Sequence, residues 1–236
     1  MSLRTKERTI TRFHFPRWVD SLKPLLGGGA VFGGLYAVVV LTFGFAPTAT
    51  DVGYMPRQPI PYSHALHAGE LGMDCRYCHT TVEHTAHAWV PPTQTCLGCH
   101  TNIHPNKSTD TANPDPKDKL NNLLVAATSG NPVPWVRIHD LPDYSYFNHS
   151  AHVTRGIGCA SCHGRVDRME EVWQQERLSM SWCLKCHRNP EEHLRPLDKI
   201  TDMEWRLPRD EQLALGAKLR EENKINPSTD CSTCHR

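Results

Sequence analysis

The feature that most constrains this 236-residue chain is that its ten cysteines form five pairs, each spaced Cys-x-x-Cys and each followed at once by histidine. The pairs are Cys75/Cys78, Cys96/Cys99, Cys159/Cys162, Cys183/Cys186 and Cys231/Cys234, and the histidines that follow them are His79, His100, His163, His187 and His235. No cysteine is left over for another purpose. The pattern therefore decides what kind of interior the chain can build.

Disulfides, zinc sites and thioredoxin-like redox pairs also use Cys-x-x-Cys, but none of them requires a following histidine. Covalent attachment of c-type haem does require it, because the two thiols bond to the porphyrin and the histidine becomes the proximal iron ligand. With histidine at 15 of 236 positions, five coincidences have a chance on the order of one in a million. The sequence thus predicts five covalently bound haem c groups.

Residues 25–46 form an uncharged run of 22 residues, which as a helix would span about 33 Å and match the core of a bilayer. The preceding residues 1–24 carry mostly basic charges, at Arg4, Lys6, Arg8, Arg12, Arg17 and Lys23. Positive-inside reasoning predicts a cytoplasmic basic segment at 1–24, a single transmembrane helix at 25–46 and residues 47–236 in the periplasm or another extracytoplasmic space. The alternative is a cleaved signal peptide, whose apolar core is usually shorter than this run.

The segment 47–236 is too short to give each of five haems a globular domain of its own, so the porphyrins are expected to form its core. Strand patterns are sparse, whereas proline, glycine and polar residues are dense. We predict a mostly α fold with extensive coil, built around stacked haems, with one helix from Asp210 to Asn223. Acidic residues outnumber basic ones in this segment, so it carries no basic nucleic-acid footprint.

An internal repeat aligns residues 62–67, Tyr-Ser-His-Ala-Leu-His, with residues 147–152, Phe-Asn-His-Ser-Ala-His. Each copy lies shortly before one haem motif, and a second haem motif follows that one in both halves. The repeat predicts two dihaem modules at about 60–104 and 135–193, with the fifth haem in residues 200–236. The intervening stretch from His104 to Pro134 is rich in Asn, Asp, Lys and Pro and is expected to be a surface excursion.

The ligand in the sixth coordination position of a haem iron decides whether the haem transfers electrons or binds a substrate. The strongest candidates for this distal position are the repeated pairs His64, His67, His149 and His152, because three-residue spacing lets two imidazoles leave one helix face toward different haems. For the fifth haem, His139 is the first choice and Met180 the alternative. The remaining histidines of the segment are expected to be solvent or propionate neighbours: His84, His87, His104 and His193.

Beyond the haem motifs, the chain resembles the pentahaem cytochrome c subunit of bacterial alternative complex III. The resemblance rests on residues 52–64, 67–72 and 75–79 in the first half and on 141–144, 147–149, 162–169, 180–183 and 186–191 in the second. Its His-x-x-His modules are also similar to the cytochrome c7 and c3 group. The resemblance implies a membrane complex with an iron-sulfur subunit, multispanning quinol-binding subunits and a monohaem cytochrome c.

The leading functional hypothesis is an electron-transfer subunit of a quinol:electron acceptor oxidoreductase that passes electrons along its haems to a periplasmic acceptor. No independent catalytic centre is expected, because the chain offers a distal ligand for each iron. Two alternatives remain, a catalytic multihaem reductase with one open haem site and a stand-alone membrane quinol dehydrogenase cytochrome. A single transmembrane helix forms no enclosed quinone pocket, which disfavours the second alternative.

Overall fold

The computed structural model describes residues 14–44, 51–103 and 116–235, apart from the side chains of 116–118. The chain divides into two units, Met1–Ala49 and Thr50–Arg236. In the first unit, helix α1 (Trp18–Gly44) has a mean hydropathy of 1.9 over its most apolar window and is long enough to cross a membrane. It begins before the apolar run predicted at 25–46, and residues 45 and 46 of that prediction lie outside the described residues.

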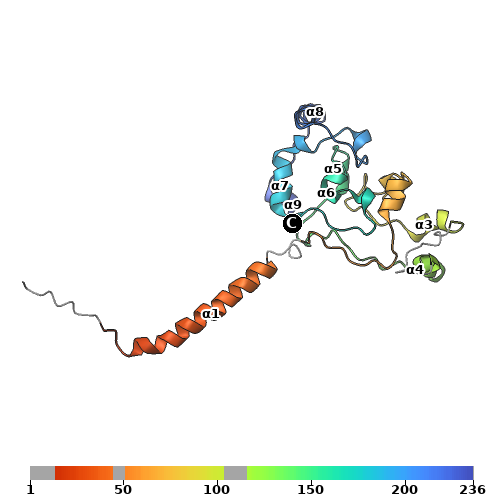
Figure 1. Cartoon of the computed structure of the whole chain (residues 1–236). Helices are drawn as coiled ribbons and strands as arrows, with labels where there is room; N and C mark the ends of the chain where they lie inside the picture. The colour runs from red at the N-terminus through yellow and green to blue at the C-terminus, as the bar shows by residue number, and fades with distance from the viewer. Residues whose placement is uncertain (1–13, 45–50, 104–115, 236) are drawn as a thin grey trace, which may run out of the picture. The chain divides into compact units, whose positions relative to one another are not determined.

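The second unit, drawn in Figure 1, contains short helices separated by coil. Its α-helices are α2 (Cys75–Cys78), α3 (Thr93–His100), α4 (Pro116–Ser129), α5 (His149–Val153), α6 (Ala160–His163), α7 (Met180–Arg188), α8 (Arg209–Glu222) and α9 (Cys231–Cys234). A π-helix, η2 (Ala65–Glu70), and three 3-10 turns complete it: η3 (Val166–Arg168), η4 (Pro190–Glu192) and η5 (Leu197–Lys199). Among the described residues the only strand-like pairings are two isolated bridges, Ser145 with His235 and Ile157 with Leu194. These elements confirm the mostly α fold with extensive coil, and α8 lies within one residue of its predicted bounds.

The prediction of a surface excursion at 104–134 is wrong for residues 116–129, whereas residues 130–134 are largely exposed coil. Residues 116–129 form α4, whose Leu120 and Leu123 are buried against Ile60 and against Leu97 of α3. Residues 104–115 lie outside the described residues. The polar composition hid a helix whose apolar side chains three residues apart, Leu120, Leu123 and Ala126, gather on one face, whereas Leu124 and Val125 stay exposed beside two asparagines.

Helix α8 packs against η4 through a glycine. A Cβ atom added at Gly216 would collide with the backbone of Glu191, with its carbonyl carbon and Cα 2.7 Å away. Arg220, one turn further along α8, pairs with the Glu191 carboxylate at 2.5 Å. The helix can therefore approach the turn closely only where it carries no side chain.

Substituting Gly216→Ala is expected to destabilise the protein by about 1–3 kcal/mol, because the new methyl group must push α8 away from η4. At an exposed helical site the same change would stabilise by about 1 kcal/mol. The matched control is Ala214→Gly on the exposed face of α8, which should cost about 1 kcal/mol from helix propensity alone. Denaturant midpoints of the full-length, haem-loaded protein in detergent measure both; a raised midpoint for Gly216→Ala would show that the turn yields to the helix.

Candidate haem-attachment sites

All five Cys-x-x-Cys-His motifs lie on helical turns. The first motif forms α2, the second ends α3, the third runs through α6, the fourth lies in α7 and the fifth forms α9. Side-chain caps begin two of these turns: Asp74 accepts from the backbone N–H of Arg76 at 2.8 Å, and Ser179 accepts from that of Trp182 at 3.4 Å. A helical turn brings side chains three residues apart to one face, so both cysteines of a motif can reach the same group.

The alternative uses of Cys-x-x-Cys find no support in the geometry. The ten cysteines, all within the described residues, form no disulfide. In the described part of the chain, no three His, Cys, Asp or Glu side chains gather as a zinc site would require.

The motifs follow one another in space in an order that differs from their order in the sequence. Cys78 of the first motif lies near Cys96 of the second, and Cys75 lies near Cys159 of the third. Cys162 of the third lies near both cysteines of the fourth motif, and Cys183 of the fourth lies near Cys234 of the fifth. The spatial order is second, first, third, fourth, fifth, and Figure 1 shows the corresponding helices from α3 through α6 to α7 and α9.

The two ends of this array are its most accessible parts. Of the ten cysteines, Cys99 in the second motif and Cys231 in the fifth are exposed, whereas the other eight are partly buried. The array is therefore covered along its middle and open at its ends.

The first His-x-x-His pair is held by an aromatic side chain. Tyr62 stacks on His67 with ring centroids 4.4 Å apart and meets His64 edge to face at 4.8 Å. The Nδ1 atom of His67 lies 2.8 Å from the carbonyl oxygen of Ser63, so Nδ1–H can donate to it and leave Nε2 free. This is the arrangement of a metal-ligating histidine.

The second pair repeats this arrangement almost atom for atom. Phe147 stacks on His152 at 4.4 Å and meets His149 edge to face at 4.8 Å. The Nδ1 atom of His152 lies 2.7 Å from the carbonyl oxygen of Asn148. The sequence repeat is therefore also a repeat of side-chain geometry.

Three of the four repeated histidines face a motif histidine at one characteristic separation. Ring centroids are 6.1 Å apart for His67 and His100, 6.1 Å for His152 and His187, and 6.4 Å for His149 and His163. An iron bonded to one nitrogen of each ring at about 2 Å places the two centroids roughly 6 Å apart. The side chains present thus fit haem irons gripped from both sides.

His64 completes the pattern by its surroundings. It is largely buried among His79 and His67, and burial, aided by these neighbours, lowers its pKa to about 4. The repeat aligns His64 with His149 and His79 with His163, so it predicts His64 and His79 as a fourth pair. The Nδ1 atom of His64 is buried without a hydrogen-bond partner.

The motif histidines are oriented in the same way as the distal ones. The Nδ1 atoms of four of the five lie 2.6–3.1 Å from backbone carbonyl oxygens, with His79 on Trp89, His100 on Ile103, His187 on Ser228 and His235 on Tyr144. Such bonds fix the ring orientation and direct Nε2 toward a metal. Sequence reasoning did not find these acceptors, because backbone carbonyls leave no residue signature and two of them are distant in the chain.

Burial favours the neutral form of the candidate ligand imidazoles, which is the form that can bind iron. Burial lowers the pKa of His163 to about 3, and the neighbouring His139 and His149 add to the effect. The pKa of His149 and that of His152 are lowered by burial as well. Because a charged imidazolium has no lone pair to offer, these low pKa values suit metal ligation.

The two candidates for the fifth haem lie in different places. The ring of His139 meets His163 edge to face at 4.5 Å, too close for an iron between them, and its Nε2 atom is buried without a partner. Met180 begins α7, one turn before Cys183, which neighbours Cys234 of the fifth motif, and its side chain is exposed. The structure thus brings His139 to the third motif and Met180 to the region of the fifth.

Among the remaining histidines that the structure describes, none of His84, His87 and His193 has a ring contact with a motif histidine. The ring of His87 lies 5.5 Å from that of Trp89, and burial lowers the pKa of His193. His104 lies outside the described residues.

Comparison with known proteins agrees with a haem-binding chain. Residues 145–236, which contain three of the five motifs, match the family model described as cytochrome c7 and related cytochrome c. The chain is also similar to the menaquinone reductase, multihaem cytochrome c subunit, of Nitratidesulfovibrio vulgaris (strain Hildenborough). The two are 29% identical over 210 residues, which cover 89% of this chain and 90% of the relative.

Proposed function

We propose that this chain is the electron-transfer subunit of a membrane quinol:electron acceptor oxidoreductase and carries five covalently bound haem c groups. The observation that carries the proposal is the set of facing imidazole pairs 6.1–6.4 Å apart. Haem c bound there supplies reversible one-electron chemistry. The chain's own residues attach the haems, ligate the irons and exclude water from them.

The proposed ligand set joins each motif histidine to one distal side chain. His64 serves the first motif, His67 the second, His149 the third and His152 the fourth. For the fifth motif, the proximity of α7 to α9 favours Met180 as the distal ligand. It is preferred over His139, which is the first choice from the sequence alone but lies against His163. Methionine opposite histidine raises the potential of a haem, so this end of the array would be the stronger oxidant.

A complete ligand set favours an electron carrier over a catalytic reductase. A reductase must leave one iron open on its distal side for substrate. The repeated pairs fill four distal positions, and Met180 or His139 is available for the fifth. The exposed ends at Cys99 and Cys231 are the positions where electrons would pass to and from partners.

Helix α1 supports a membrane location, and the similar protein supports membrane-bound partners. Helix α1 is a candidate membrane span, and positive-inside reasoning leaves residues 1–24 cytoplasmic and the haem unit periplasmic. The similar protein from N. vulgaris is a subunit of a menaquinone reductase, and the resemblance to alternative complex III likewise indicates a quinone-linked complex. We propose that an iron-sulfur subunit, multispanning quinol-binding subunits and a monohaem cytochrome c are the partners.

The haem content gives a direct prediction. Intact mass of the full-length protein should show five attached haems, and the double variant Cys231→Ala/Cys234→Ala should show four. The fifth motif lies at one end of the array of motifs, so the other four can be matured without it. A haem count below five in the unmodified protein, or thiols that react with an alkylating reagent, would contradict the proposal.

The function itself is tested by comparing the purified complex with the isolated chain. A menaquinol analogue should reduce the haems in the complex and leave them oxidised in the isolated, haem-loaded chain. Quinol oxidation by the isolated chain would instead favour a stand-alone quinol dehydrogenase. A five-coordinate, high-spin signal in the resting protein would favour a reductase.

A further inference from the structure

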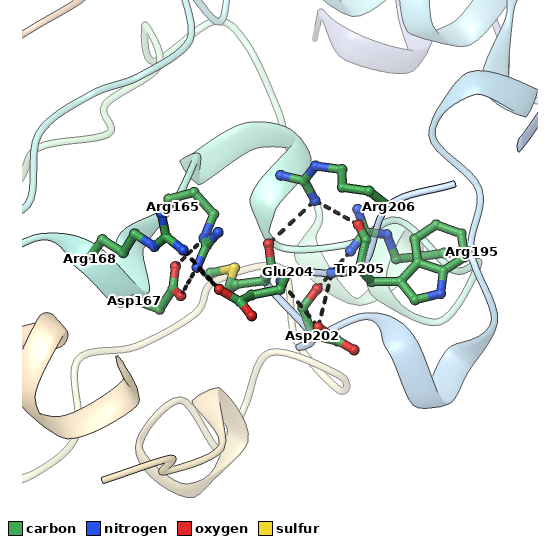
Figure 2. Close-up of polar contacts among 9 residues, drawn as sticks. Arg165, Asp167, Arg168, Arg195, Asp202, Glu204, Trp205 and Arg206 are labelled. Atoms are coloured by element: carbon green, nitrogen blue, oxygen red, sulfur yellow. Dashed lines mark hydrogen bonds and ion pairs between the residues drawn. The ribbon is translucent and has the colours of Figure 1, made fainter. Parts of the chain in front are cut away.

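Arg195 is a buried cation with an unusual set of partners. Its exposed fraction is 8%, and its guanidinium lies over the Trp205 ring, with Cζ 5.0 Å from the ring centroid (Figure 2). Its Nη1 atom donates to the backbone carbonyls of Lys199 at 3.3 Å and Asp202 at 3.1 Å. Carbonyl dipoles and an aromatic face hold the guanidinium without cancelling its charge.

Arg195 forms no ion pair with a carboxylate among the described residues, although the charge of Asp202 lies close enough to act on it. The Oδ1 atom of Asp202 instead accepts from the backbone N–H groups of Glu204 and Trp205, and Oδ2 faces the Lys199 ammonium at 3.7 Å. The Nε atom of Arg195 is buried without a hydrogen-bond partner. A buried, unpaired charge is costly, so its retention calls for a compensating role.

The neighbouring arginines are arranged differently. Arg165 pairs with Asp167 at 2.5 Å and with Glu204 at 2.9 Å, and Arg168 pairs with the same Glu204 at 2.9 Å. Figure 2 shows this network beside Asp202, with Arg195 stacked on Trp205 and Arg206 nearby. In the described part of the chain, Arg206 likewise donates only to backbone carbonyls, of Met203 and Trp205, but it is exposed. Arg195 is therefore the buried cation of this group that forms no ion pair.

The charge lies against the third haem motif. A Cβ atom added at Gly158 would meet the Arg195 side chain, with Cζ 2.5 Å and Cδ 2.7 Å away. Gly158 directly precedes Cys159, and the Arg195 backbone N–H donates to Gly156 at 2.9 Å. Because Gly158 has no side chain, nothing separates the guanidinium from the backbone that leads into the motif.

We infer that the fixed charge of Arg195 raises the reduction potential of the haem attached at Cys159 and Cys162. Reduction adds one negative charge, which a nearby buried cation stabilises. With the guanidinium about 10 Å from the haem iron and an effective dielectric constant of about 20, the charge should raise the reduction equilibrium constant about tenfold. The third motif is the middle of the array, so the charge would favour an electron at its centre.

The inference rests on the proposed haem content, so haem is counted first in each variant. In full-length protein with five haems, Arg195→Met should lower the reduction equilibrium constant of one titrating component about tenfold, which lowers its midpoint potential by about 59 mV for one electron. Arg195→Lys keeps the charge and should retain most of the potential. Arg206→Met removes an exposed charge beside the same site and should shift no component by more than a small fraction of this amount, because solvent screens it.

Spectroelectrochemical titration of the haem absorption bands separates the outcomes. Five haems in Arg195→Met with all midpoints unchanged would overturn the inference and leave the proposed function intact. Equal shifts in Arg195→Met and Arg195→Lys would show that packing, not charge, sets the potential, and would also overturn it. If Arg195→Met loses haem, Arg195→Gln, which retains an amide donor for the carbonyls of Lys199 and Asp202, carries the same test.

Discussion

Full-length protein in which all ten motif cysteines are replaced by alanine is expected to lose the fold of its C-terminal unit. Among the described residues of this unit only ten apolar side chains are buried, and its one cluster of buried side chains consists of Ile60, Leu120 and Leu123. Burial of apolar side chains must offset the backbone entropy that every ordered residue loses. Ten side chains cannot offset the ordering of a unit this long, so the haems must supply the missing interior.

Circular dichroism and limited proteolysis of the membrane-bound protein measure this effect. The cysteine-free variant should lose cooperative thermal unfolding and be cut throughout residues 51–235. The matched control is the double variant Cys231→Ala/Cys234→Ala, which removes one haem at the end of the array and should keep a cooperative transition. A sigmoidal melt in the cysteine-free variant would show that the polypeptide folds without its haems.

The sequence predicted those parts of the fold and site that depend on local spacing. The haem motifs, the His-x-x-His repeat and helix α8 are recognisable within a few residues, because caps, helical periodicity and attachment chemistry act over one or two turns. The structure adds that Tyr62 and Phe147 hold equivalent histidine pairs with the same separations. That equivalence was visible in the sequence only as an aromatic residue before each pair.

Features that depend on distant segments could not be predicted from the sequence. The Nδ1 atom of His187 meets the carbonyl of Ser228, and that of His235 meets Tyr144, across separations of 41 and 91 residues. The spatial order of the motifs also arises from such contacts, since Cys75 meets Cys159. In the sequence, the burial of Arg195 is indicated only weakly, by its position between the apolar residues Leu194 and Pro196. The burial becomes evident only in the fold.

His149 and His139 both contact His163, and their substitution should have opposite consequences for the third haem. The separation of 6.4 Å between His149 and His163 accommodates an iron, whereas the separation of 4.5 Å between His139 and His163 does not. His149→Ala should therefore open one iron of five, and about one fifth of the haem should become high-spin. His139→Ala should leave every iron six-coordinate.

Electron paramagnetic resonance and the near-infrared charge-transfer bands of the oxidised, full-length protein report these spin states. Added imidazole should return the His149→Ala signal to low spin, because the free ligand can enter the position that the side chain left. His67→Ala and His152→Ala serve as references, since each faces its motif histidine at 6.1 Å without a competing neighbour. High-spin haem in His139→Ala with none in His149→Ala would reverse the assignment. His139 would then be the distal ligand, moving away from His163 when iron is bound, and His149 would only pack beside it.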